Sequence, residues 1–141
     1  MKSFNSRIKN YISGIITILN DRNDYVEKIN QIGEIERKIA NIYILKPVLE
    51  FCKAISISVF QEKIVSVSFE LATKLKVSEL SEILKCKPEF RENIYDEETV
   101  ISFRYDNYIL NTSFKKETVS NKSDESKFDD LYISSININT I

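Results

Sequence analysis

The stretch ISISVFQEKIVSVSFEL, residues 55–71, decides the fold. Apolar residues alternate with serines over 55–59 and again over 65–71, on either side of a short charged break at Gln61-Glu62-Lys63. A period of two is typical of strands that bury one face and leave the other in water. The stretch therefore predicts a β-hairpin with one solvated, serine-rich face.

Upstream of this hairpin the apolar spacing is helical. Residues three or four apart predict a helix along 4–19 with one apolar stripe: Phe4, Ile8, Tyr11, Ile12, Ile15 and Leu19. Asp24, followed three residues later by Glu27, predicts the start of a second helix, which isoleucines at helical spacing extend to Ile42. Two helices joined by a short turn predict an antiparallel α-hairpin that packs on the sheet.

Downstream the chain returns to strand patterns. A short helix is expected from Ser78 to just before Pro88, and strands over 100–105 and 108–114 are joined by a turn at Asp106-Asn107. A polar loop over 115–130 and a last strand over 131–138 follow. We therefore expect a single α+β domain over 1–141: an N-terminal α-hairpin on an antiparallel sheet of about five strands, with one short inserted helix. No internal repeat is visible in the sequence.

The composition argues against the common kinds of enzyme. The chain has no histidine in 141 residues and only two glycines, Gly14 and Gly33. Without histidine there is no Ser–His or Cys–His pair, and without further glycines there is no dinucleotide fingerprint or phosphate loop. We expect no catalytic residues and no cofactor. An enzyme that works through paired carboxylates stays as an alternative, and it requires a cleft with a strongly raised carboxyl pKa.

Metal, nucleic-acid and membrane binding are not expected either. The acids at 124, 125, 129 and 130 lack the spacing of an EF-hand loop. The net charge is −1 and the basic residues are dispersed, which disfavours nucleic acid. The apolar stretch 11–19 is too short to span a membrane and no cleavage site follows it, so a cytoplasmic location is expected. Cys52 and Cys86 are expected as buried free thiols.

Charge is unevenly distributed along the chain. Residues 1–90 carry 14 Lys/Arg against 11 Asp/Glu, and residues 91–141 carry 6 against 10. Aromatic residues, among them Tyr132, accompany the acids of the last third, and aromatic side chains are favoured at protein interfaces. The predicted partner-binding residues are Glu92, Tyr95, Asp96, Glu97, Glu98, Tyr105, Asp106, Tyr108, Asp124, Glu125, Asp129 and Asp130.

One further pattern resembles a known group of proteins. The capped segment VSELSEILKCKP (77–88), the hairpin 101–114 and the closing strand 131–138 follow one another in an order similar to that of small bacterial immunity proteins of contact-dependent growth inhibition and related toxin systems. The resemblance implies a non-catalytic protein that binds and neutralises a cognate toxin domain, such as a nuclease with a cationic cleft. An acidic surface would complement that cleft and speed the encounter.

A second function remains open. Secretion chaperones that hold an effector are also small, acidic α+β proteins, and they form homodimers. The mass of the free protein separates the two, because a stable homodimer favours the chaperone.

Overall fold

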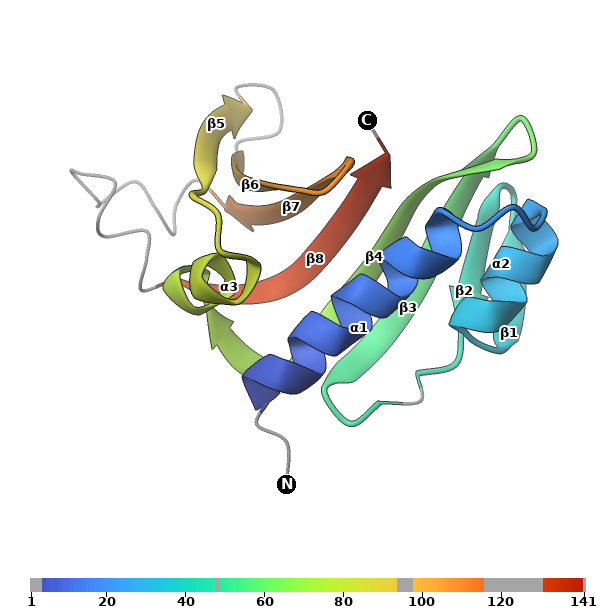
Figure 1. The fold of residues 1–141 in the computed structure, drawn as a ribbon, viewed down its shortest axis with the longest axis horizontal. Coiled ribbons are helices and arrows are strands. Elements are labelled where there is room, and N and C mark those ends of the chain that lie inside the picture. Colours follow the sequence, from blue (N-terminus) through green and yellow to red (C-terminus); the bar gives the residue numbers. More distant parts are fainter. Residues whose placement is uncertain (1–3, 48, 94–97, 116–130, 141) are drawn as a thin grey trace.

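The computed structural model describes residues 4–47, 49–93, 98–115 and 131–140. In these ranges three helices and eight strands follow one another (Figure 1): α1 (Phe4–Leu19), α2 (Tyr25–Ile32), β1 (Ile35–Ile39), β2 (Ile42–Leu45), β3 (Cys52–Phe60), β4 (Lys63–Lys76), α3 (Val77–Leu84), β5 (Glu89–Asn93), β6 (Glu98–Tyr105), β7 (Tyr108–Lys115) and β8 (Tyr132–Thr140). None of the helices in these ranges is long and apolar enough to cross a membrane.

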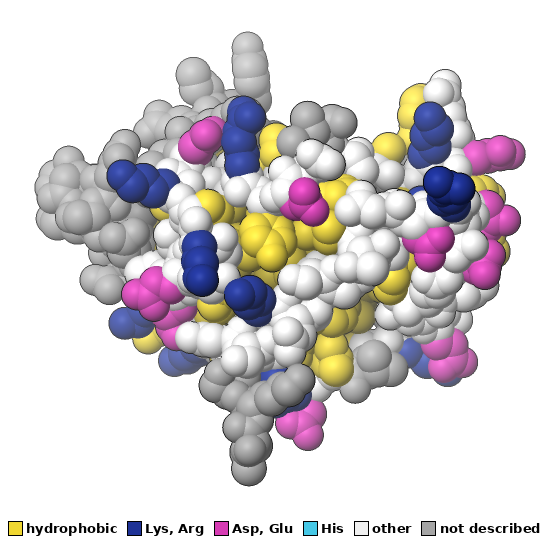
Figure 2. All heavy atoms as spheres, viewed as in Figure 1, with side chains coloured by type: hydrophobic (Ala, Val, Ile, Leu, Met, Phe, Trp, Pro, Cys, Tyr) yellow, Lys and Arg dark blue, Asp and Glu magenta, His cyan; other side chains and the backbone are white. Residues whose placement is uncertain are grey.

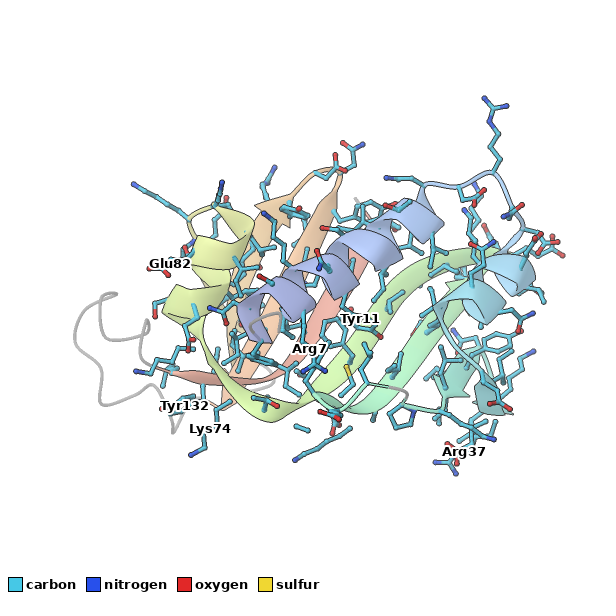
Figure 3. All side chains as sticks on the ribbon, turned by 60° about the horizontal axis from the view of Figure 1, so that its bottom comes forward. Arg7, Tyr11, Arg37, Lys74, Glu82 and Tyr132 are labelled. Carbon is cyan, nitrogen blue, oxygen red and sulfur yellow. The ribbon has the colours of Figure 1, made fainter. Side chains whose placement is uncertain are left out.

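The strands form one antiparallel sheet in the order β1-β2-β3-β4-β8-β7-β6-β5. The expected α+β class, with N-terminal helices packed on an antiparallel sheet, is confirmed. The sheet holds eight strands in the described residues rather than about five, because β1, β2 and β5 were not predicted. It curls around the helices, which lie on its concave face (Figures 1 and 3). We call the opposite, convex side the outer face.

The sheet consists of two four-stranded meanders that meet at β4 and β8. Strands β1–β4 follow α1 and α2, and strands β5–β8 follow α3. Within each meander every strand pairs with its neighbour in sequence, and only the β4–β8 pairing joins the two. The repeat is therefore one of topology, which explains why no repeat was visible in the sequence.

Helix α2 is shorter than predicted. It begins as expected, since the Asp24 side chain accepts a hydrogen bond from the Glu27 amide at 2.9 Å, but it ends at Ile32. Gly33, a poor helix former, follows with extended backbone, and its amide closes the last turn on the Ile29 carbonyl. The isoleucines at 35, 39, 42 and 44 then enter strands β1 and β2, where β-branched residues are favoured.

The tight turns are made without glycine. Gln61 and Glu62 both adopt positive φ, at 51° and 62°, between β3 and β4. Asp106 has φ 57° in the predicted two-residue turn between β6 and β7. Residues other than glycine are sterically strained in this left-handed region, and the strain is smallest for aspartate and asparagine. The predicted turn positions are confirmed at both hairpins.

A β-bulge changes which residue of β4 faces the core. Between the pairs Ser58↔Ser66 and Val59↔Ile64, strand β4 contains one extra residue, Val65. Ile64 is consequently 9% exposed and Val65 is 36% exposed, although the alternation predicted Val65 on the buried face. Because two residues of β4 lie opposite one residue of β3 at the bulge, the inward–outward alternation of β4 shifts by one position there.

Helix α1 closes the core over both meanders. Ile8, Ile12, Ile15 and Ile16 are its buried residues. The Tyr11 ring points from α1 toward the sheet (Figure 3), with its centre 5.1 Å from that of Phe69 on β4 and 5.6 Å from that of Phe51. Edge-to-face ring pairs of this kind add about 1 kcal/mol to the burial of their area. Apolar residues of both meanders belong to one core cluster.

Candidate interaction surface

Most of the predicted partner-binding residues lie outside the described ranges. These are Tyr95, Asp96, Glu97, Asp124, Glu125, Asp129 and Asp130. Glu92 and Glu98 lie at the same end of the β5–β6 strand pair, but Asn93 pairs with Glu98 and Glu92 with Thr99, so the two acidic positions belong to opposite faces of the sheet. Strand β5 is an edge of the described sheet.

The structure does not bring Glu98 and Asp106 together. Glu98 begins β6 and Asp106 directly follows its end. At about 3.3 Å per residue the two are roughly 25 Å apart along the strand. On the helix side of the molecule, acidic and basic side chains are interspersed among the described residues (Figure 2). The predicted acids of β6 and its following turn therefore occupy two places on the molecule.

Of the two described tyrosines of the predicted set, Tyr105 contacts α1 and Tyr108 contacts Asn20, the residue directly after α1. Tyr108 is only 5% exposed, and its hydroxyl donates to Asn20 Oδ1 at 2.7 Å. Its burial leaves it little surface to offer as an aromatic anchor, and burial also raises the pKa of its hydroxyl. Tyr105 is half-buried, with its hydroxyl 3.4 Å from Ser13 Oγ. Both side chains connect the second meander to the first helix or to the residue after it, a contact that local patterns do not reveal.

A row of mostly polar residues runs across the outer face. Pairing partners continue from strand to strand through all eight strands in the order Arg37, Ile44, Ser56, Ser68, Asn137, Asn111, Ser102 and Glu89. Directly opposed residues share one face of an antiparallel sheet, so this row lies on a single face. The serine face predicted for 55–71 is thus part of a longer, largely polar row, in which Ile44 is apolar and Ser102 is buried.

Four exposed apolar side chains lie at one end of the outer face. Ile39 opposes Ile42, Ile42 opposes Ser58, and Phe60 lies two residues farther along β3 on the same side. Val65 lies beside Ser66, the partner of Ser58. Ile39, Ile42, Phe60 and Val65 are 53%, 38%, 62% and 36% exposed. We call these four residues the outer-face patch; clustered exposed apolar side chains are typical of interaction sites.

A shallow hollow of about 190 Å³ lies in the same face. It is lined by Ala54, Ser56, Ser68, Phe69, Glu70 and Ser135. The hollow lies where β4 leaves β8: Glu70 pairs with Ser135 and the next pair is Leu75 with Ile133, so four residues of β4 face one of β8. The local loss of pairing opens the sheet surface at this point.

A larger hollow of about 310 Å³ lies between α2 and the β3–β4 turn. Two charged side chains that line this hollow, one at the N-cap of α2 and one on α2, form hydrogen bonds within the protein. The Asp24 carboxylate caps α2, and Lys28 Nζ donates to the Leu19 carbonyl at 2.9 Å. These two groups hold the α1–α2 connection in place.

The far end of the outer face is basic and aromatic. Tyr132 is 51% exposed, and the Nζ atoms of Lys74 and Lys76 lie 5.3 and 5.9 Å from its ring centre. Figure 3 shows Tyr132 and Lys74 on the side of the sheet away from α1. Cation–π contacts of this kind hold the ring and the ammonium groups together. Tyr132 is thus one aromatic residue of the acid-rich last third that the structure leaves exposed.

The cysteines are free, as expected, but only Cys52 is fully buried, while Cys86 is half-buried. Burial raises the pKa of the Cys52 thiol to about 11, so it is protonated at neutral pH. Burial, followed by the neighbouring Cys52, also raises the pKa of Tyr11. A protonated thiol is a poor nucleophile. Within the described ranges no three His, Cys, Asp or Glu residues gather into a group that could hold a metal ion.

The comparisons with known proteins concern the fold alone. No family model matches the sequence, and no curated protein matches it. Among solved structures, the chain is similar to a DUF4309 family protein (YjgB) from Bacillus subtilis, with a TM-score of 0.58 and 9% identity. The match covers 93% of this chain and 95% of that one. At this identity the likeness shows a shared fold and carries no function.

Sequence patterns missed the hollow and the outer-face patch. Glu70 continues the outward alternation of Ser66 and Ser68, and this is the only local signal for it. Ser135 reaches the hollow through the β4–β8 pairing, although α3 and strands β5–β7 separate it from Glu70 in the sequence. The spacing of Ile39 and Ile42 fits a helix, so the sequence does not predict their exposure on strands β1 and β2.

Proposed function

We propose that this chain is a non-catalytic immunity protein that binds a cognate bacterial toxin domain and neutralises it. The observation that carries the proposal is the outer face: it has no helix packed on it among the described residues, and it combines exposed apolar side chains with short polar ones. Protein interfaces have this composition, with apolar anchors surrounded by polar groups. Residues 91–141 carry 10 Asp/Glu against 6 Lys/Arg, and this excess of negative charge in the last third of the sequence would favour a cationic partner.

The partner can be found through the protein itself. The tagged chain is used to capture proteins from the source cell, and any toxin encoded beside it is expressed with and without the chain. We expect a one-to-one complex and restored growth of cells that express the toxin. A neighbouring toxin that remains lethal and fails to bind the chain would refute the proposal.

A matched pair of variants locates the surface. Phe60→Ser removes the most exposed side chain of the outer-face patch, and Val26→Ser removes one that is 44% exposed on α2. If the outer-face patch is the interface, F60S weakens the complex by about tenfold or more, as for an aromatic anchor, and V26S leaves it unchanged. Equal effects of the two variants would place the interface elsewhere.

The outer-face patch also bears on the secretion chaperone. Such chaperones are homodimers, and an exposed apolar patch can serve as the contact between two copies. Sedimentation of the free protein gives the answer. A monomer favours the immunity protein, and a dimer that F60S dissociates favours the chaperone.

A further inference from the structure

Among the described residues, Glu70 on the outer face is an exposed carboxylate without an ion-pair partner. In antiparallel sheets a basic residue directly opposite a carboxylate on the adjacent strand stabilises the pair. The neighbours of Glu70 are Ala54 on β3 and Ser135 on β8. No lysine or arginine nitrogen of the described residues lies within 4 Å of its carboxylate, whereas Glu34 and Glu89 each have such a partner, Lys46 and Arg104.

The short side chains on both sides keep this carboxylate accessible. Ala54 and Glu70 are exposed, and Ser56, Ser68 and Ser135 are half-buried around the hollow. The hydroxyl oxygens of the serines can accept hydrogen bonds, and the carboxylate can only accept them. The hollow therefore holds one negative charge among three hydroxyl groups, each of which can donate as well as accept a hydrogen bond.

The size of the hollow favours a single side chain over a metabolite. Sites for small molecules typically enclose about 300–1,000 Å³, and this hollow holds about 190 Å³ and is open to solvent. An ammonium or guanidinium group carries several donors and a positive charge, and therefore matches acceptors of this kind.

We propose that the hollow around Glu70 receives a lysine or arginine side chain of a protein partner. This inference deepens the proposed function, on which it rests for the identity of the partner, because a toxin with a cationic cleft presents such side chains. The hollow shares its face with the outer-face patch: Ser56, which lines it, opposes Ile44, and Ile44 follows Ile42 by two residues on β2. A partner seated on the patch could thus reach Glu70 as well.

The first experiment needs no toxin. Hexalysine and hexaglutamate are titrated at low salt into the ¹⁵N-labelled protein, the Glu70→Gln variant and the control Glu82→Gln, which alters an exposed carboxylate on α3 (Figure 3). We expect hexalysine to shift the amide signals of Ala54, Ser56, Ser68 and Ser135 in the wild type and E82Q. These shifts should be lost in E70Q and absent with hexaglutamate. Equal shifts in E70Q, or shifts confined to other acidic segments, would overturn the proposal.

The second experiment separates this inference from the proposed function. With a captured toxin, E70Q should weaken the complex roughly three- to fivefold, as expected for one partly exposed ion pair, and E82Q should not. A toxin that binds E70Q as tightly as the wild type overturns the role of the hollow and leaves the immunity function standing. Hexalysine binding at the hollow without any toxin partner supports the hollow and refutes the immunity function.

Discussion

The two meanders share a topology and differ in what holds them in place. The first, β1–β4, has two helices and short connections, and its outer face presents the outer-face patch. The second, β5–β8, has one short helix and contains the acid-rich segments of the sequence. Tyr105 connects the second meander to α1, and Tyr108 connects it to Asn20 directly after α1. The β4–β8 pairing connects it to the strands of the first meander. Two different sequences thus form the same four-stranded meander, because strand pairing depends on apolar–polar alternation and on turn geometry.

The largest expected effect on stability tests whether the two meanders fold together. Phe69 on β4 and Phe103 on β6 are 1% and 0% exposed, one in each meander. Replacing either by alanine should lower the free energy of unfolding by about 3–5 kcal/mol, since each leaves a cavity in the shared core. Urea unfolding followed by circular dichroism should show a single transition for both variants. Phe60→Ala, at an exposed site, serves as the control and should cost under about 1 kcal/mol.

Separate behaviour of the meanders would contradict a shared core. In that case F103A would produce a second transition at low urea while the rest of the protein unfolded at the wild-type midpoint. F69A and F103A would then differ in the slope of the unfolding free energy against urea, which scales with the surface exposed.

The sequence predicted the strands that show alternation and missed those whose partners are distant or ambiguous. Residues 55–71 and the turn at Asp106-Asn107 specify their hairpins locally. The isoleucines at 32, 35, 39 and 42 suit one helix face as well as two strands, and Gly33 decides between them only together with pairing to β3. Strand β5 has little alternation of its own and depends on β6.

The candidate surface was harder to predict than the fold. The predicted acidic residues were grouped by composition, and composition does not say where a residue lies on a strand. Glu98 and Asp106 therefore fell into one predicted surface although they lie at opposite ends of β6. Glu70 has two short residues opposite it on the neighbouring strands, Ala54 and Ser135, and these leave the hollow open beside the break in the β4–β8 pairing. Strands β4 and β8 are distant in the sequence, and no local pattern predicts that they pair or in which register.

A smaller effect is expected at the contact between α1 and the second meander. Tyr108→Phe removes the 2.7 Å hydrogen bond to Asn20 and should cost about 1 kcal/mol, because both groups lie in a part-buried contact. Tyr105→Phe removes a longer contact of 3.4 Å to Ser13 and should cost less. A double-mutant cycle of Y108F with Asn20→Ala measures the coupling. Additive losses in that cycle would show that the hydrogen bond does not connect the two parts.

The smallest expected effect distinguishes the turns of the two meanders. Glu62 has φ 62° in the first and Asp106 has φ 57° in the second. Glycine relieves the steric cost of the left-handed region at both sites but raises the entropy of the unfolded chain. Because glutamate tolerates this region less well than aspartate, Glu62→Gly should stabilise by about 0.5 kcal/mol and Asp106→Gly should change little. Lys63→Gly, at a site without positive φ, is the control and should destabilise; an E62G variant as unstable as K63G would mean that the first turn does not need the left-handed conformation.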